Sequence, residues 1–379
     1  MDNNRILLSS PHMGGEEIKQ IQNAFETNWI APAGPHIEEF EKKLSKIHQN
    51  KFVAAVQSGT AAIHLALDLL GVDQGDIVLC QSFTFIGSIN PVKYIKAIPV
   101  LVDSEMETWN ICPEALETAI KKHITIGKKP KAIIVVHLYG MPAKMKNIIE
   151  LSKKYEIPII EDAAESLGSK IDNILCGCFG DFGILSFNGN KIITTSGGGA
   201  IISSDDKAIV KARFLSTQAK ENAEHYEHKE IGYNYCLSNV SAAIGIGQLS
   251  VLEERILARR KNYYFYYNLL SSIEGISFLD EPKGYYSNRW LTSIVIDKSK
   301  FKNIDSRKLR LTLERENIES RPLWKPMHLQ PIFKDCSYFG SNISENLFNK
   351  GLCLPSGSNL TDNQLKRIKK VLSDFFKLI

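Results

Sequence analysis

The sequence lacks the features that mark membrane and secreted proteins. No apolar run approaches the roughly 20 residues needed to cross a bilayer. The first 17 residues, MDNNRILLSSPHMGGEE, hold neither a long apolar core nor a small-residue cleavage site. We therefore expect no signal peptide, no membrane attachment and a cytoplasmic location.

An excess of one charge sign is also missing. The chain has 46 Lys and Arg against 42 Asp and Glu, so its formal net charge is only +4 and no nucleic-acid partner is expected. Its seven cysteines are scattered, and only Cys176 and Cys178 lie close together. An odd count without metal-ligand spacing indicates reduced thiols and no metal site.

The length of 379 residues fits one large domain followed by a smaller one. Residues 52–203 alternate between short β-branched apolar runs and helical segments, which is typical of an α/β domain with a mostly parallel sheet flanked by helices. The predicted strands are FVAAV (52–56), DIVLC (76–80), IPVLV (98–102), AIIVV (132–136) and IPIIE (157–161). Helices are predicted over 60–70, from Pro113, and over about 143–154.

A different pattern begins after residue 237. The stretch from Ser238 to about Ser272 holds no proline and repeats apolar residues at helical spacing, which predicts one long helix. A strand near 291–296, a helix near 306–316 and a last helix from Asp362 should follow. We expect the large domain to end inside the long helix, which places it at 1–250 and a small α+β domain at 251–379.

Three loop segments hold residues that could carry chemistry. The first, QSGTAA (57–62), lies between a predicted strand and a predicted helix. The helix N-terminus offers free N–H groups to an anion, so a phosphate could bind at Gly59, Thr60 and Ala61. A plain strand-to-helix turn with a Ser or Thr cap explains the segment equally well.

The second segment, EDAAE (161–165), directly follows a predicted strand, so its acids should face the ligand crevice of the sheet. Taken alone, Asp162 is more simply explained as a helix cap. The third segment, SFNGNK (186–191), ends in Lys191 ahead of a Gly-rich turn. Such a lysine is usually an ordinary surface residue, but a buried lysine can serve as a carbonyl nucleophile.

The order and spacing of these segments favour one cofactor, pyridoxal phosphate. A phosphate turn, an acid about 100 residues later and a lysine about 30 residues further on are the parts it requires. The phosphate anchors the cofactor, the carboxylate keeps the pyridine nitrogen protonated, and the lysine holds the aldehyde. Phe85, at the end of SFTF (82–85), could cover the ring, although it could also be a core phenylalanine.

The motifs resemble those of the DegT/DnrJ/EryC1/StrS sugar aminotransferases, which are fold-type I pyridoxal-phosphate enzymes. The similarity runs from about Ser10 to about Ser356, and the set of motifs is highly specific. Its most characteristic pieces are SGTAAIHLAL, SFTF, HLYG, EDAAES, SFNGNKIITTSGGGAI, GYNY and RPLWKPMH. The resemblance implies the fold of type I, with a large cofactor-binding domain that has an N-terminal arm and a smaller C-terminal domain.

The resemblance also implies roles for single residues. Lys191 matches the lysine that carries the cofactor, and Asp162 matches the acid that pairs with the pyridine nitrogen. Glu165 stands near the ring hydroxyl, and Phe85 falls on the stacking position.

Phosphate-holding positions are matched by Gly59, Thr60 and Ser186. Asn234, in GYNY, resembles an asparagine that reaches the phosphate from the neighbouring subunit. The resemblance thus implies a homodimer with shared active sites. Cys236 departs from the family, because an arginine is frequent at that position.

Within the family, the closest similarity is to enzymes that act on UDP-linked 4-keto-6-deoxy N-acetyl sugars in bacillosamine biosynthesis. The implied reaction moves an amino group from L-glutamate to the sugar ketone, for bacterial glycan biosynthesis. GDP-perosamine synthases share much of the pattern, and a 3-keto-sugar aminotransferase is a further alternative, so the nucleotide, the ring carbon and the configuration stay open. Substrate contacts are expected at Trp29, Arg321, Trp324, Lys325 and His328, although the last four fit a surface loop equally well.

Two other function classes compete with this interpretation. A sugar dehydratase on the same fold typically replaces the lysine with histidine, so Lys191 disfavours it. A non-catalytic regulator would not need the lysine, the acid and the phosphate turn together. The sequence therefore favours the aminotransferase.

Overall fold

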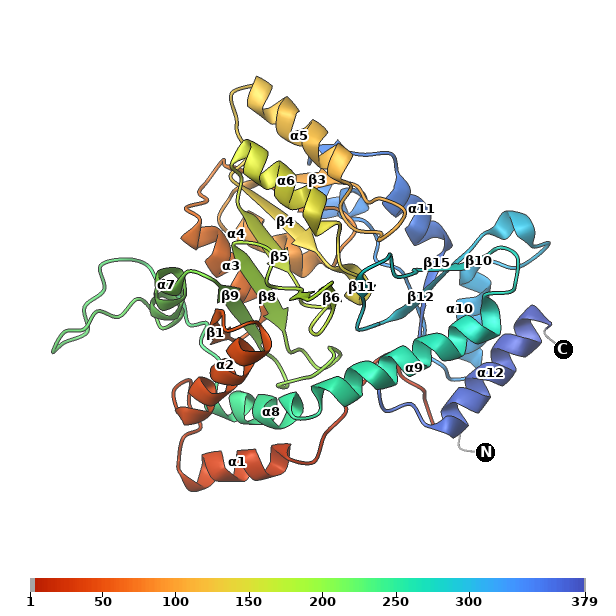
Figure 1. The fold of residues 1–379 in the computed structure, drawn as a ribbon, viewed down its shortest axis with the longest axis horizontal. Helices are drawn as coiled ribbons and strands as arrows, with labels where there is room; N and C mark the ends of the chain where they lie inside the picture. The colour runs from red at the N-terminus through yellow and green to blue at the C-terminus, as the bar shows by residue number, and fades with distance from the viewer. Residues whose placement is uncertain (1–3, 378–379) are drawn as a thin grey trace.

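An eight-stranded sheet forms the centre of the large region (Figure 1). In the computed structural model, which describes residues 4–377, the strand order is β1-β9-β8-β5-β4-β2-β3-β14. Neighbouring strands from β8 to β14 are parallel, and β9 runs antiparallel to β1 and β8. The mostly parallel sheet predicted from the sequence is therefore confirmed. Its strands are β1 Phe52–Val56, β2 Ile77–Gln81, β3 Ile98–Val102, β4 Ala132–Val136, β5 Ile159–Asp162, β8 Phe182–Ser186, β9 Gly199–Ser203 and β14 Tyr338–Phe339.

Helices cover both faces of this sheet (Figure 1). Ile133 and Val135 of β4 share a core with α5 and α6, whereas Ala132 and Ile134 share another with α3, α4 and α7. Strands buried on both faces need no polar side, so they read as continuous apolar runs. No helix within residues 4–377 is long and apolar enough to cross a membrane. The helices are α1 Glu17–Glu26, α2 Pro35–Ile47, α3 Gly59–Leu69, α4 Asn90–Tyr94, α5 Pro113–Thr125, α6 Met145–Tyr155, α7 Asp206–Ser216, α8 Asn239–Leu249, α9 Leu252–Leu270, α10 Ser306–Arg315, α11 Ile343–Lys350 and α12 Asp362–Phe376.

The prediction of one long helix after residue 237 is wrong, because α8 and α9 are separate helices. The Ser250 hydroxyl donates to the Gly247 carbonyl at 2.6 Å, and Val251 leaves helical geometry with φ −114° and ψ 10°. A serine hydroxyl that hydrogen-bonds a carbonyl of the preceding turn competes with the backbone hydrogen bonds of the helix. Glycine, which has a low helix propensity, weakens the helix further. Apolar spacing alone does not reveal such a break.

A smaller antiparallel sheet, β10-β12-β15-β13, organises the C-terminal region. Its core includes residues of α9, α10 and α12, and also Ile6, which pairs with Ile318. Thus an N-terminal residue joins the small region, and β14 from the C-terminal region joins the large sheet. The domain boundary between residues 250 and 251 stays a prediction. The remaining strands are β6 Lys170–Ile171, β7 Ile174–Leu175, β10 Ile276–Phe278, β11 Tyr285–Tyr286, β12 Thr292–Ile296, β13 Arg321–Pro322 and β15 Gly351–Leu354.

Candidate active site

A cavity of about 340 Å³ lies at the carboxyl ends of β5 and β8. Ligands of open α/β sheets bind at this edge, because successive loops converge there. The cavity brings together residues from all three segments singled out in the sequence. The predicted site residues that line it are Gly59, Thr60, Phe85, Asp162, Glu165, Ser186, Lys191 and Trp324.

The start of α3 is both a capped helix end and an open anion site. The Ser58 hydroxyl accepts the Ala61 N–H at 3.0 Å, so Ala61 is engaged by the cap and does not line the cavity. The N–H groups of Gly59 and Thr60 belong to the first turn, which a helix cannot satisfy internally. A Cβ at Gly199 would lie 2.4 Å from the Ser58 carbonyl carbon, so only glycine lets β9 pack against this turn. The turn and the sheet thus hold donors at the cavity wall, where they suit a phosphate.

Asp162 ends β5 and is 5% exposed. Its carboxylate accepts the Ser88 hydroxyl at 2.6 Å and the Ala164 N–H at 3.1 Å, and both partners are neutral. Residues 163–169 form turns rather than a helix, so the explanation of Asp162 as a helix cap is wrong. No cationic side chain within residues 4–377 pairs with it. A buried carboxylate without a cation is costly, and a protonated ring nitrogen would supply the missing charge.

Lys191 is not an ordinary surface lysine, because its side chain is only 13% exposed. Its Nζ lies 3.6 Å from Glu165 Oε1 and 4.1 Å from the centroid of the Trp290 ring. The other oxygen of Glu165 accepts the Tyr139 N–H at 2.7 Å. Burial raises the pKa of Glu165, and the nearby Lys191 ammonium opposes that rise. The amine therefore has a defined place between an acid and an aromatic face.

Aromatic rings line one side of the cavity. Phe85 is 51% exposed and lies 5.3 Å from Trp324 between ring centroids, so it is not a core phenylalanine. The Tyr139 ring stacks between Trp290 and Trp324 at 6.5 and 6.4 Å. Trp290 was not among the residues predicted from the sequence. It lies 99 positions after Lys191 and shows no local signal of its own.

Asn234 and Trp29 do not line this cavity. Asn234 is exposed, while its neighbours Tyr233 and Tyr235 stack on each other at 4.9 Å. The segment nevertheless runs beside the phosphate turn, because the Gln57 N–H donates to the Tyr235 carbonyl at 2.7 Å. Trp29 is 48% exposed and follows α1. Their expected contacts stay predictions.

Of the remaining predicted substrate residues, Arg321 and Lys325 line one hollow, and His328 does not. Arg321 and Lys325 line a hollow of about 600 Å³ that shares Trp290 and Trp324 with the first cavity. His328 lines neither hollow. Its Nδ1 shares a 2.8 Å hydrogen bond with the Ser82 hydroxyl. A direct substrate contact by His328 stays a prediction without support from its position.

A buried group of His137, Glu161 and Cys176 has the residue types of a metal site. His137 Nδ1 accepts the Ala143 N–H at 2.9 Å, so its Nε2 carries the proton that is donated to Glu161 at 2.7 Å. Glu161 also accepts backbone N–H groups within residues 177–180. The histidine therefore has no free nitrogen lone pair, and the group braces β5 rather than holding a metal.

Comparison with known proteins identifies the family. Residues 11–373 match the DegT/DnrJ/EryC1/StrS aminotransferase family. The chain belongs to this family. EpsN of Bacillus subtilis, named as a pyridoxal phosphate-dependent aminotransferase, is 50% identical over 379 residues, which cover 99% of this chain and 97% of that protein. GDP-perosamine synthase of Escherichia coli O157:H7 is 34% identical over 98% of each chain.

The solved structures agree with this assignment. The crystal structure of a DegT DnrJ EryC1 StrS aminotransferase from Brucella abortus superposes with a TM-score of 0.88, at 31% identity and 95% coverage of both chains. The predicted fold class, fold type I, is therefore confirmed. The chain is an enzyme, an aminotransferase, as the sequence predicted.

Proposed function

We propose that this aminotransferase moves an amino group from L-glutamate to a nucleotide-linked 4-keto-6-deoxy sugar. Its cofactor is pyridoxal 5′-phosphate. One observation carries the proposal: a single cavity joins a helix start whose first N–H groups have no partner within the helix, a buried carboxylate without a cation, and a lysine amine whose side chain is 13% exposed. These three groups match the phosphate, the ring nitrogen and the aldehyde of the cofactor.

The cavity residues divide the work of holding the cofactor. Gly59, Thr60 and Ser186 would bind the phosphate, Asp162 the ring nitrogen, and Phe85 one face of the ring. When bound, pyridoxal phosphate supplies the electron sink that lets the α-hydrogen of the amino acid leave as a proton. Asp162 contributes by keeping a positive charge on the ring nitrogen, because an opposite charge in contact favours the charged form.

Lys191 would move the proton during the reaction. Its amine, when it is not bonded to the cofactor, would accept the α-proton of the amino-acid donor and hold it for the next transfer. Glu165 and Trp290 lie against this amine at 3.6 and 4.1 Å, and together they limit where it can reach. The side chain is only 13% exposed, which limits the water that can compete for the proton.

We also propose that two subunits complete each site through Asn234. The segment that follows α7 extends away from the body of the molecule (Figure 1) and exposes Tyr226 by 80% and Ile231 by 85%. Symmetric dimers are the commonest soluble oligomers, and such an arm can reach a partner's cavity. Mixed Lys191→Ala and Asn234→Ala proteins should then recover partial activity after subunit exchange. An inactive mixture that demonstrably contains heterodimers would place Asn234 in its own subunit's site.

The sugar nucleotide should bind across the second hollow. Arg321 and Lys325 offer cationic groups for a diphosphate, and Trp324 borders both hollows. UDP is our first choice of nucleotide, for an N-acetylated 4-keto sugar. GDP is the second candidate, since GDP-perosamine synthases of Escherichia coli and Vibrio cholerae are 34% and 32% identical to the chain.

The direct test supplies purified protein, pyridoxal phosphate and glutamate with a panel of UDP-, GDP- and dTDP-linked 4-keto and 3-keto sugars. Product analysis should find one amino sugar and a matching amount of 2-oxoglutarate. Glutamate alone should convert the bound cofactor to its amino form, which its absorbance reports. A protein that binds the cofactor but aminates none of these sugars, or that removes water from them instead, would contradict the proposal.

A further inference from the structure

Trp290 contacts both the backbone beside Lys191 and the Lys191 amine. It is 1% exposed, and its indole N–H donates to the Asn190 carbonyl at 2.7 Å. Asn190 immediately precedes Lys191, whose Nζ lies 4.1 Å from the Trp290 ring centroid. The indole thus binds the backbone next to Lys191 at one edge and carries the Lys191 amine on its face.

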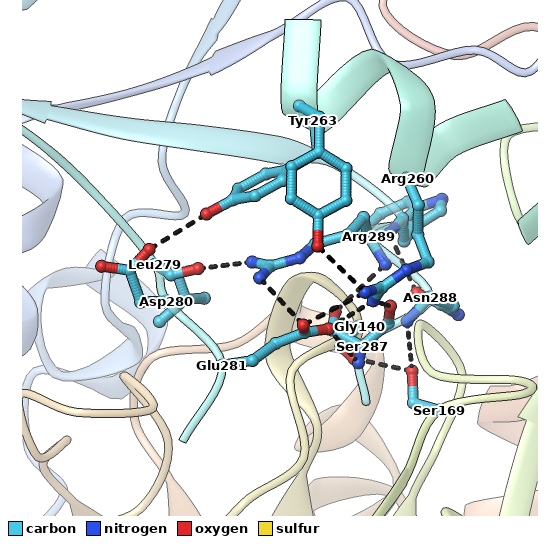
Figure 2. Close-up of polar contacts among 12 residues, drawn as sticks. Gly140, Ser169, Arg260, Tyr263, Leu279, Asp280, Glu281, Ser287, Asn288 and Arg289 are labelled. Atoms are coloured by element: carbon cyan, nitrogen blue, oxygen red, sulfur yellow. Dashed lines mark hydrogen bonds and ion pairs between the residues drawn. The ribbon is translucent and has the colours of Figure 1, made fainter. Parts of the chain in front are cut away.

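The loop before Trp290 is fixed by a buried ionic network (Figure 2). Glu281 pairs with Arg260 and accepts the Ser287 N–H at 2.7 Å, and it lies 3.6 Å from the Arg289 guanidinium. Arg289 also packs on the Tyr263 ring, with 3.7 Å between its guanidinium carbon and the ring centroid. The backbone of Arg289 has φ +53°, a left-handed conformation that is uncommon for a residue with a side chain. The network holds that conformation in place.

Asn288 links the same loop to residues 165–169, which include the cavity residue Glu165. Its side-chain amide donates to the Glu165 and Leu167 carbonyls at 3.0 and 2.9 Å. Its backbone N–H donates to the Ser169 hydroxyl at 2.8 Å, as Figure 2 shows. Its side-chain oxygen accepts the backbone N–H of Trp290 at 2.9 Å. A Cβ at Gly140 would lie 2.0 Å from that oxygen, so only glycine permits this approach. The backbone of Trp290 is therefore fixed relative to Glu165.

Arg259, on α9, connects Trp290 to Lys191 from the other side. Its guanidinium donates to the Trp290 carbonyl at 2.7 Å, the Lys191 carbonyl at 3.4 Å and the Ser9 hydroxyl at 2.9 Å. Arg259 is 1% exposed and has no carboxylate partner among the described residues. Burial lowers the pKa of Arg259 to about 9, so it is still charged at neutral pH. Burying a charge that is paired only with carbonyl groups is costly. Here the Arg259 guanidinium links the backbones of Trp290 and Lys191, the two residues whose ring and amine are in contact.

We take Lys191 as the cofactor lysine of the proposed function. We infer that Trp290 is a positioning residue: its ring is a platform that holds the Lys191 amine whenever the amine is not bonded to the cofactor. Arg259 holds this platform in place. Transamination frees the amine in each half-reaction, and a free four-carbon side chain has many rotamers. The indole face attracts an ammonium through its quadrupole, most strongly where water is excluded. The amine then stays at the cavity wall, within reach of the proton that it must move.

The first test measures how accessible the amine is, in cofactor-free full-length protein. An amine-reactive label is applied at pH 7, and labelled Lys191 is quantified by peptide mass spectrometry against exposed Lys19. Trp290→Leu should raise Lys191 labelling about tenfold, which corresponds to about 1.4 kcal/mol. Trp290→Phe should raise it less, because phenylalanine keeps a weaker aromatic face. Trp324→Leu is the control, since it opens the same cavity without touching the amine.

A matched pair of arginine variants tests the second part. Arg259→Met and Arg255→Met each remove a buried guanidinium that binds the segment before α1. Arg255 donates to the Met13 carbonyl there, and it has no hydrogen bond to Lys191 or Trp290. Only Arg259→Met should raise Lys191 labelling, and in the loaded enzyme it should lower kcat with little change in KM. If Arg259→Met does not fold, Arg259→Lys replaces it with the same expectation.

The outcomes separate this inference from the proposed function. Folded Trp290→Leu protein with unchanged Lys191 labelling overturns the platform, and so does an equal rise in the Trp324→Leu control. Equal effects of the Arg255 and Arg259 variants overturn the role of Arg259. A Lys191→Ala protein that still holds the cofactor covalently would instead refute the assignment of Lys191, and it would leave the labelling results as they stand.

Discussion

Replacing Asp162 with asparagine separates an electrostatic role from a structural one. The carboxylate is buried, and its protein partners are the Ser88 hydroxyl at 2.6 Å and the Ala164 N–H at 3.1 Å. An amide oxygen still accepts one of these donors, and a serine hydroxyl can turn to accept from the amide nitrogen. The Asp162→Asn variant should therefore fold, with a free energy of unfolding within about 1 kcal/mol of the wild type.

The same change should weaken catalysis strongly. An amide cannot hold a proton on the cofactor ring nitrogen, so a charge-assisted hydrogen bond of roughly 1.5 to 3 kcal/mol is lost. At 1.36 kcal/mol per factor of ten, this predicts a fall in kcat of about 10- to 150-fold. The loss should appear in the donor half-reaction, where the ring accepts electrons.

The assay follows cofactor absorbance after glutamate is mixed with loaded enzyme, in single-turnover conditions. Thermal unfolding of the same samples reports the change in the free energy of unfolding. Cofactor content is measured by absorbance after denaturation. Near-normal turnover with the cofactor bound would refute the reasoning, because the buried carboxylate would then have no electrostatic task. Loss of folding together with activity would likewise show that Asp162 acts on the structure.

Three further changes test other parts of the site. Lys191→Ala should fold but lose the covalent hold on the cofactor, which mass spectrometry after borohydride reduction detects, and amination should fall by at least the 10²- to 10⁴-fold typical of general acid–base catalysis. Gly199→Ala places a methyl group 2.4 Å from the Ser58 carbonyl carbon, so it should lower both Tm and cofactor affinity, whereas Gly189→Ala, whose nearest contact is 3.7 Å away, should change Tm little. Burial raises the pKa of Glu165 above its ordinary value of 4.5, so the folded protein holds the carboxyl proton more tightly than the unfolded chain does. The free energy of unfolding therefore falls as the pH rises from 4.5 through the pKa of the folded state. Compared with wild type in cofactor-free protein, Glu165→Gln should thus gain more Tm at pH 7 than at pH 4.5.

Most of the large sheet could be predicted because its strands are covered on both faces. Continuous apolar runs such as β3 and β4 match their predicted bounds residue for residue. The strands β8 and β9 were missed because glycine opens β9 and lies inside β8, which hides their pattern. Glycine is needed there since a Cβ at Gly183 would lie 2.0 Å from the Gly177 carbonyl oxygen.

The site residues that lie at or just after strand ends could be predicted from the sequence. Those that reach the site only through tertiary contacts could not. Lys191, Asp162 and the phosphate turn each end or follow a strand. The strands β5 and β8 are parallel, and β1 runs in the same direction because the antiparallel β9 lies between it and β8, so the three segments meet at one edge of the sheet. Trp290 and Arg259 come from distant segments, and nothing in their neighbours signals a contact with Lys191. Whether Phe85 lies in the core or in the cavity wall could not be decided from the sequence, because an aromatic residue after a strand suits both places.

The pairing of Ile6 with Ile318 has a consequence for how the chain is made. During synthesis Ile6 leaves the ribosome long before Ile318, since 312 positions separate the two isoleucines. At about 5 to 20 residues per second, this delay lasts roughly 15 to 60 s. Throughout that time Ile6, which is fully buried in the finished fold, lacks its partner Ile318, and the edge of β3 lacks β14. The nascent enzyme therefore exposes two unfinished surfaces to chaperones until β14 (Tyr338–Phe339) has emerged.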